Sequence, residues 1–307
     1  MRMQNRIIHK RIHSFWGIQL RLTDTIIIGS LVLYTILNLI YRLRLEEWAK
    51  NIISNLVILG GYLACVYFYQ HSKKRILRFL IRTASVQVLF LYLFSAVHDY
   101  QLLFSYWKDP QVIVLEETIF GIIPNLFLQQ YAVPLLTEIM MFAYVLYIPL
   151  YPVLAALIFF KFGEDHFEYY LLLLAGINTL CNLGFIVYPV ASPYWWEPLK
   201  ESYQLPMRGY LFTRVGEFIR THMHQAGGSL PSPHCAIATV MWYFSYQVGR
   251  RLFYILTPFI IMIYVSTVFC GYHYTTDAVI GIMAGLLMIL VSRPYFQRMQ
   301  KQNVPKG

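Results

Sequence analysis

The stretch PSPHCAIATVMWYFSYQVGRRLFYILTPFIIMIYVSTVFCGYHYTTD, residues 231–277, decides the fold of this chain. It contains two apolar segments, His234–Val248 and Leu252–Cys270, which are joined by the basic pair Arg250-Arg251. Such continuous apolar runs predict two helices of a membrane hairpin, because lipid offers the backbone groups of an open structure no hydrogen-bond partner. Polar, ionisable residues stand at both ends of this stretch, where a membrane helix meets water.

The composition places the whole chain in a membrane. Of its 307 residues, 58% are hydrophobic and only 13% are charged, whereas soluble proteins average about 25% charged residues. A formal net charge of +10 would suggest a nucleic-acid partner for a soluble protein. Here the basic residues cluster in short loops, as membrane topology requires. We therefore expect an integral membrane protein that contacts the bilayer, with no nucleic acid as partner and no cofactor.

Hydropathy predicts an all-α bundle with about eight membrane-spanning helices. The first, Ile26–Tyr41, is long enough to resemble a signal-peptide core, but no small-residue cleavage site follows it, so we expect it to be retained. Residues 1–307 are expected to form one integral-membrane domain, with accessory spans in 1–75, a core in 76–293 and a basic cytoplasmic tail in 294–307. The other expected spans are Ile52–Gln70, Ile76–His98, Val133–Phe160, Tyr169–Val190, His234–Val248, Leu252–Cys270 and Asp277–Val291.

The basic residues predict how these spans are oriented. Eight spans place both termini on one side of the membrane, and that side collects seventeen of the 25 lysines and arginines, including the run Lys73–Arg75. The side richer in basic residues is normally cytoplasmic, so both termini are expected inside. His234, His273 and Asp277 then all lie at the outer membrane interface.

That placement predicts one site built from three span ends. His273 and Asp277 are four residues apart, so in a helix they share one face. A carboxylate bonded to one ring nitrogen fixes the tautomer of a histidine and leaves the other nitrogen to attack, for example a phosphoryl group. His234 could then protonate the leaving alkoxide as general acid. Its position near a helix start also favours a bound phosphate.

Two outer stretches are expected to surround this site. Residues 100–131 are too interrupted by acidic residues and prolines to span, which predicts interfacial or re-entrant structure over the outer face. In the loop 191–228, apolar residues recur mostly at three- and four-residue spacing and predict a helix. This helix either lies on the membrane or forms a lid with arginines on its polar side. The apolar stripe consists of Leu211, Val215, Phe218, Ile219 and Met223, and the arginines are Arg208, Arg214 and Arg220.

Other interpretations are open for the same residues. His273 and Asp277 could be a structural pair between two spans, and His234 an ordinary interfacial histidine. Gly227-Gly228-Ser229 resembles a flexible turn, and Cys235 and Cys270 could form a disulfide. A zinc site is a further alternative, although no HExxH motif accompanies its histidines. Its ligands would be His222, His224, His234 and His273.

The motifs at the two ends of the opening stretch resemble the signatures of a known family. PSPH at 231–234 and HYTTD at 273–277 are similar to the second and third signatures of the type 2 phosphatidic acid phosphatase superfamily, PSxH and SR-x5-H-x3-D. Together with YPVASPYW at 188–195, they resemble the branch of inositol phosphorylceramide and sphingomyelin synthases. The likeness covers roughly residues 104–293, and it implies a six-helix core and a phosphotransfer enzyme that needs no metal.

The resemblance implies a role for each matching residue. His273 corresponds to the nucleophile, Asp277 to the carboxylate that orients it, and His234 to the acid and base. Ser232 corresponds to the motif serine that helps to hold the phosphate. Ser266, seven residues before His273, corresponds to the serine of the third signature.

The chain departs from the family where phosphate-binding cations are expected. Thr267 stands where many phosphatases have the arginine of the third signature, and the first signature, K-x6-RP, is absent. A dianionic phosphate still requires positive charge, so one or two basic residues of the outer loop are expected near the pocket. The candidates are Lys200, Arg208, Arg214 and Arg220.

The implied activity is the transfer of a phospho-headgroup between lipids through a phosphohistidine. The donor would be a phospholipid or lipid phosphate, and the acceptor a lipid or inositol hydroxyl. With water as the acceptor, the same residues would form a phosphatase acting on phosphatidate or a prenyl (di)phosphate. The missing first signature favours transfer. A transporter or scaffold that binds lipid without turnover is a third interpretation.

Overall fold

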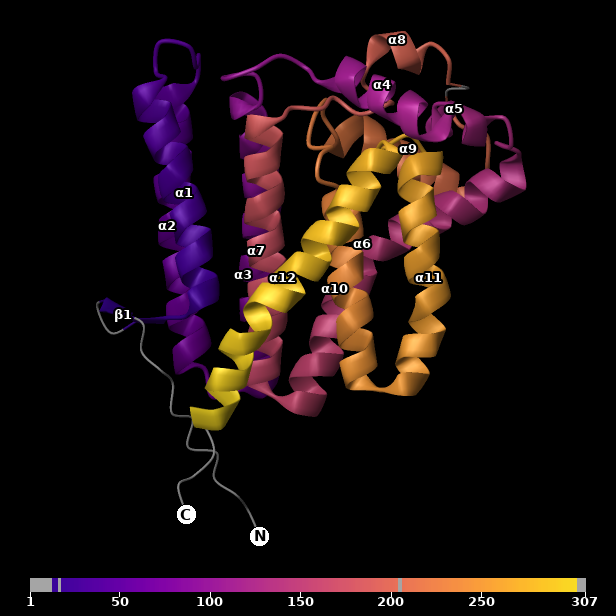
Figure 1. Ribbon diagram of the computed structural model, residues 1–307. Coiled ribbons are helices and arrows are strands. Elements are labelled where there is room, and N and C mark those ends of the chain that lie inside the picture. The colour runs from indigo at the N-terminus through magenta and orange to yellow at the C-terminus, as the bar shows by residue number, and fades with distance from the viewer. Residues whose placement is uncertain (1–12, 16–17, 204–205, 303–307) are drawn as a thin grey trace.

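The computed structural model describes residues 13–15, 18–203 and 206–302, and most of them are helical (Figure 1). A short antiparallel pair of strands, β1 (His13–Phe15) and β2 (Ile18–Leu20), precedes the first helix. The basic residues from Arg2 to Arg11 and the end of the predicted tail, 303–307, lie outside the described residues. The helices are α1 (Leu22–Ile40), α2 (Trp48–His71), α3 (Arg75–Ala96), the 3₁₀ helix η1 (Val97–Tyr100), α4 (Asp109–Phe120), α5 (Pro124–Gln129), α6 (Pro134–Phe162), α7 (Glu164–Val187), α8 (Glu197–Lys200), α9 (Leu211–Met223), α10 (Pro233–Val248), α11 (Arg250–Phe269) and α12 (Thr275–Gln302).

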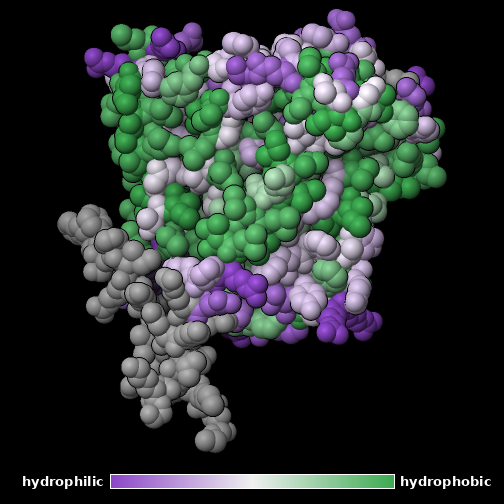
Figure 2. Space-filling model, in the orientation of Figure 1, coloured by the Kyte–Doolittle hydropathy of each residue, from purple (hydrophilic) through white to green (hydrophobic). Residues whose placement is uncertain are grey.

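Seven helices of the described chain are long and apolar enough to cross a membrane, which confirms an all-α integral membrane protein. Figure 2 shows the apolar surface as a broad band between two polar ends. All eight predicted spans are helical, but α10 is not among the seven, because it has only 16 residues. At 1.5 Å per residue it is about 24 Å long, less than the hydrocarbon core of about 30 Å. It packs against α6, α7, α11 and α12, so most of its surface faces protein.

Glycines let α12 approach α10 closely. Gly281 lies against the carbonyl of Ser232, and Gly285 against that of Ala236, so closely that a Cβ atom at either glycine would collide with the oxygen. Close approach at small residues is common where membrane helices pack. The first turns of α10 and α12 are thereby held together.

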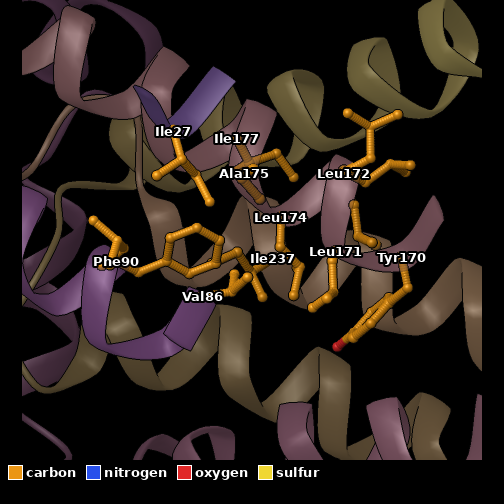
Figure 3. Close-up of a cluster of buried hydrophobic side chains, with 14 of the residues drawn as sticks. Ile27, Val86, Phe90, Tyr170, Leu171, Leu172, Leu174, Ala175, Ile177 and Ile237 are labelled. Carbon is orange, nitrogen blue, oxygen red and sulfur yellow. The ribbon is translucent and has the colours of Figure 1, made fainter. Parts of the chain in front are cut away.

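The helix α7 forms the centre of the bundle. Its residues from Phe167 to Ile177 are all buried. Figure 3 shows side chains of this segment gathered with Ile27 of α1, Val86 of α3 and Ile237 of α10. The core therefore joins the amino-terminal helices to those that carry the predicted site.

A buried ionic cluster strengthens the same junction. Arg82 of α3, only 1% exposed, donates from Nη1 to Asp24 of α1 (2.6 Å) and from Nε and Nη2 to the two oxygens of Glu168 in α7 (2.8 Å each). The hydroxyl of Tyr62 in α2 also donates to Asp24 (2.6 Å). One guanidinium thus links charged and polar groups of four helices.

The two ends of the bundle differ in structure. In Figure 1, α1 begins and α12 ends at the lower end, whereas α4, α5, α8 and α9 gather at the opposite end. Residues 100–131, predicted to cap the outer face, contain α4 and α5, and the predicted apolar stripe lies on α9. In that stripe Leu211, Val215 and Phe218 are exposed, as expected of a helix that contacts lipid.

Candidate active site

The amino termini of α10 and α12 bring the predicted catalytic residues together. Ser232 caps α10, where its hydroxyl accepts a hydrogen bond from the backbone N–H of Cys235 (3.3 Å). The backbone N–H of Ser232 donates to the carbonyl of Asp277 (3.0 Å). Pro233 fills the first helical position, where an N–H would have no helical partner. The next residue, His234, is therefore fixed within one turn of two touching helix ends.

The two predicted catalytic histidines are in contact. Nδ1 of His234 lies 3.2 Å from Nε2 of His273. On its other side, Nδ1 of His273 lies 3.0 Å from the backbone carbonyl of Ser229. A carbonyl only accepts hydrogen bonds, so this contact assigns the ring hydrogen of His273 to Nδ1 and leaves the lone pair on Nε2. Nε2 is then the nucleophilic nitrogen, and it faces His234.

Asp277 reaches His273 largely through Ser229. The Oδ2 atom of Asp277 is 3.9 Å from Nδ1 of His273, beyond hydrogen-bond distance. The Ser229 hydroxyl donates to the same oxygen (2.5 Å) and lies 3.3 Å from Nδ1 of His273. The backbone N–H of Tyr274 also donates to Oδ2 (2.9 Å). His273 lies before the start of α12 at Thr275, so the direct contact on one helix face expected from sequence is not formed, and Ser229 bridges the two side chains instead.

The sequence interpretation of Ser229 as part of a flexible turn missed this role. Gly227 and Gly228 have φ values of +99° and +70°, a region that side chains disfavour. The Gly228 N–H donates to the side-chain oxygen of Gln101 (3.1 Å), which fixes the turn. The turn directs the next residue, Ser229, toward the imidazole. The sequence feature that could have indicated this role is a serine five residues before His234.

Replacing Ser229 by alanine is expected to lower turnover by about ten- to a hundredfold, the usual value of a hydrogen bond to a charged group. The carbonyl contact to His273 would persist, so some activity should remain. Turnover by purified protein measures this, with Ser202→Ala, an exposed serine of the outer loop, as control. Unchanged turnover in Ser229→Ala would exclude the bridge.

Two further carboxylates, both on α4, hold the loops of this site. Asp109 accepts hydrogen bonds from the backbone N–H groups of Ala191 (2.8 Å) and Ser192 (3.2 Å) and from the hydroxyl of Tyr274 (3.0 Å). Glu116 accepts from the backbone N–H of Thr276 (2.7 Å), in the first turn of α12. Both acids are fully buried. From sequence they were only interruptions in an apolar stretch, because nothing local shows that α4 folds against a segment more than 150 residues later.

Burial changes the acidity of these two groups. It raises the pKa of Asp109 to about 6. Burial, and after it the nearby charge of Asp277, raise the pKa of Glu116 to about 7 against the opposing hydrogen bond from Thr276. Glu116 is therefore partly protonated at neutral pH beside the carboxylate that supports His273.

The unfolding free energy is expected to fall as pH rises from about 5 to 8. An unfolded glutamate releases its proton near pH 4.3, while folded Glu116 keeps it until about pH 7. Between these values the folded state binds more protons, so stability is lost with rising pH. Asp109 contributes only up to about pH 6. The pH dependence of thermal unfolding in detergent should therefore be much weaker above pH 6 in Glu116→Gln. It should be unchanged in Glu46→Gln, an exposed control. An unaltered pH dependence in Glu116→Gln would contradict the raised pKa of this residue.

Comparison with protein-family models matches the PAP2 superfamily over residues 111–291, more than half of the chain, including both histidines and Asp277. The chain belongs to the PAP2 superfamily. This confirms the superfamily resemblance inferred from the two motifs. Comparisons with curated proteins and with solved structures give no match. Members of the PAP2 superfamily are generally phosphatases or phosphotransferases, so the protein is an enzyme of this broad class, acting on lipid phosphates at a bilayer.

The other phosphate-site candidates of this PAP2 protein lie in different surroundings. Ser266 is buried in α11 and donates to the carbonyl of Ile263 in its own helix (2.9 Å). Lys200 forms an ion pair with Glu197 (2.9 Å) at the surface. Arg208 and Arg214 are exposed. Among the described residues, no lysine or arginine forms a hydrogen bond or ion pair with His234 or His273.

Arg220 differs from the three candidate cations above, because its side chain is fully buried. It lies on α9 and donates from Nη2 to the carbonyl of Cys270 (2.7 Å). Cys235 and Cys270 are both free, so the disulfide considered from sequence is not formed. Arg220 is thus the one fully buried cation that the described outer loop brings toward the helix ends of the site.

The histidines of the zinc alternative do not all come together. His222 lies exposed at the end of α9. His224 lies beside His234, with ring centroids 6.4 Å apart, and its Nε2 is 3.2 Å from the hydroxyl of Tyr144. Burial, and then the charges of His273 and Arg220, lower the pKa of His224 to about 4, so this ring is neutral at pH 7. No group of three or more His, Cys, Asp or Glu side chains that could hold a metal ion occurs in the described part of the chain.

Proposed function

We propose that this PAP2 protein is a membrane lipid phosphotransferase that works through a phosphohistidine on His273. The observation that carries the proposal is the chain of contacts from Asp277 and Ser229 to Nδ1 of His273, and from Nε2 to His234. In this arrangement one ring nitrogen of the nucleophile contacts an orienting group, and the other contacts an acid. The family roles of these residues support the same assignment.

In the first half-reaction, Nε2 of His273 attacks the phosphorus of the donor lipid. The N–P bond forms, the P–O bond to the leaving group breaks, and the departing alkoxide takes a proton from His234. A phosphoryl oxygen at this position would replace His273 as the partner of Nδ1 in His234. The positive charge that develops on the imidazole of His273 is stabilised by Asp277 through Ser229.

In the second half-reaction, an acceptor hydroxyl attacks the phosphohistidine. His234 takes the hydroxyl proton, the new P–O bond forms and the N–P bond breaks, which restores His273. The backbone N–H of His234, in the first turn of α10, and the hydroxyl of Ser232 would contact the phosphoryl oxygens. A dianionic phosphoryl group also requires positive charge from outside this pair.

The surroundings of His234 favour an organic acceptor over water. The rings of Tyr144 and Tyr147, both from α6, lie 4.9 Å and 4.8 Å from the His234 ring. The packing of these two aromatic rings against His234 limits the water near this base. We therefore place a lipid or inositol hydroxyl first as acceptor, as in the sphingolipid synthase branch, with hydrolysis of phosphatidate or a prenyl (di)phosphate as the second candidate.

The proposed orientation places both termini in the cytoplasm and the site on the periplasmic, extracellular or lumenal side. Its support is the distribution of basic residues and the position of α4, α5, α8 and α9 at the end of the bundle opposite to the start of α1 (Figure 1). A donor lipid would then be taken from the outer leaflet.

The test is to incubate the purified protein with labelled phospholipids and lipid phosphates, with and without ceramide, diacylglycerol or inositol. Label transferred to an added acceptor supports the transferase, and label released only as a water-soluble phosphate supports the phosphatase. Lipid that binds without any product would support the transporter or scaffold. A chelator should leave turnover unchanged, and strong inhibition would argue against metal-independent chemistry.

A further inference from the structure

The guanidinium of Arg220 is buried, and two of its three nitrogens have no hydrogen-bond partner among the described residues. Its side chain is 0% exposed, and Nη2 donates to the Cys270 carbonyl. The other two nitrogens, Nε and Nη1, have no partner among the described residues. Buried charged groups without partners are costly, so these unpaired donors require an explanation.

A second buried arginine of the same chain shows what a structural role requires. Each of the three nitrogens of Arg82 donates a hydrogen bond, to Asp24, Glu168 or Tyr62. Arg220 has one carboxylate nearby, Glu217, at 3.8 Å, beyond hydrogen-bond distance. The difference indicates that Arg220 is not positioned for internal pairing.

Two tyrosines hold the Arg220 guanidinium in place. Its central carbon lies 4.5 Å from the ring centroid of Tyr194 and 4.4 Å from that of Tyr272. These are cation–π contacts, and they do not use the in-plane N–H groups of Nε and Nη1, which remain without an acceptor. The hydroxyl of Tyr272 donates to the carbonyl of Gly216 on α9 (3.1 Å), which fixes the ring against the helix.

The start of α9 is also fixed. Glu138 of α6 accepts hydrogen bonds from the backbone N–H groups of Tyr210 (2.7 Å), Phe212 (2.7 Å) and Thr213 (3.0 Å). Arg220 is therefore presented by an anchored helix, unlike a surface arginine, whose side chain must be ordered on binding. Such a pre-arranged planar fork matches the oxygens of a phosphate or carboxylate.

A stack of rings connects this guanidinium to the reacting histidines. The Tyr272 ring is stacked on Tyr144, with centroids 3.9 Å apart and an interplanar angle of 2°. Tyr144 in turn lies 4.9 Å from His234. No contact joins Arg220 directly to His234 or His273 within the described chain, and the contacts that connect them run through the rings of Tyr272 and Tyr144.

We propose that Arg220 forms a second anion subsite, which binds an additional phosphate or carboxylate of the donor lipid while the reacting phosphoryl group lies at His273. The inference rests on the proposed function. It predicts a donor class, namely lipids whose headgroup carries an anionic group beyond the reacting phosphate. Because Arg220 itself occupies the space between Tyr194 and Tyr272, a quaternary ammonium headgroup has no aromatic cage there.

The test compares donors that carry the second anion with donors that lack it. A prenyl diphosphate supplies a second phosphate, phosphatidylserine supplies a carboxylate, and phosphatidate supplies neither. In Arg220→Gln, the KM for the prenyl diphosphate, for phosphatidylserine or for both should rise about tenfold or more. The KM for phosphatidate should rise less than about threefold. The donor with the larger change identifies the anion. Arg44→Gln, an exposed arginine in the loop after α1, is the charge-matched control.

Equal losses with all three donors, or no loss with any, would overturn the proposal. Should Arg220→Gln fail to fold, Tyr194→Leu removes one wall of the subsite and should shift the same KM values in the same direction. Binding gives a second readout that needs no turnover. Pyrophosphate should raise the thermal unfolding midpoint of the unmodified protein more than orthophosphate does. Arg220→Lys, which keeps the charge without the fork, should lose that difference, and its persistence there would argue against the subsite.

The two proposals can fail separately. If His273→Ala retains turnover, the phosphohistidine is wrong, while the pyrophosphate measurement still decides the role of Arg220. If His273→Ala is inactive and pyrophosphate shows no preference, the phosphotransferase stands and the second subsite is rejected.

Discussion

Replacement of His273 by alanine is expected to abolish turnover, with a loss of at least about a thousandfold. Nε2 of this ring is the nucleophile of the proposed first half-reaction, and it lies 3.2 Å from Nδ1 of His234, the proposed acid. Alanine removes the atom that forms the N–P bond, so no covalent route is left. The measurement is turnover of the best donor by purified protein, together with acid-labile, alkali-stable label on the protein after a short incubation.

The control for this variant is His71→Ala, an exposed histidine at the end of α2. It should keep both turnover and labelling. Vanadate mimics pentacoordinate phosphate and should inhibit the unmodified enzyme. Label that persists on His273→Ala, or turnover that is indifferent to vanadate, would contradict the phosphohistidine.

The sequence predicted the helices and the three central residues of the site for clear physical reasons. Apolar runs long enough to span a bilayer leave the backbone one structure, and most of their ends were placed within about five residues, although α12 continues to Gln302, beyond the predicted end at Val291. His234, His273 and Asp277 stand at the ends of those runs, so hydropathy alone placed them at one interface. The length of α10 was less informative about membrane crossing, because this helix between Pro233 and Gly249 is short and is covered by protein.

The supporting residues could not be predicted in the same way. Ser229 acts because a turn with two left-handed glycines directs it to His273, and the sequence shows only a flexible-looking GGS. Asp109 and Glu116 act because α4 folds across the end of the bundle. In the sequence Arg220 looked equivalent to Arg214, yet Arg220 is buried and Arg214 is exposed. In each of these cases tertiary packing decides the role, and periodicity carries no information about it.

The largest stability effect is expected for Arg82→Met. Arg82 is paired with Asp24 and Glu168 in the bundle interior, where the three side chains are at most 4% exposed. Removing the guanidinium leaves Asp24 without an ion-pair partner among the described residues and leaves Glu168 with Arg21 alone, whose Nη1 lies 3.2 Å from Oε1 of Glu168. Breaking a buried ion pair in this way typically costs about 3–5 kcal/mol. The unfolding free energy in detergent should fall by that amount, and α1 should become more accessible to protease.

Two comparisons separate loss of charge pairing from loss of packing. Arg78→Met, one turn earlier on α3, removes an arginine that pairs with Glu164 but is 22% exposed, so its cost should be about 1 kcal/mol or less. The triple variant Arg82→Met, Asp24→Asn, Glu168→Gln removes this arginine and both of its carboxylate partners with little change of volume, while Arg21 keeps its contact with Glu164 (3.8 Å). Because the cost arises from the unpaired carboxylates, this triple variant should recover most of the lost stability. If it is instead less stable than Arg82→Met alone, the hydrogen bonds among these side chains, and not their charges, hold the amino-terminal helices against α7.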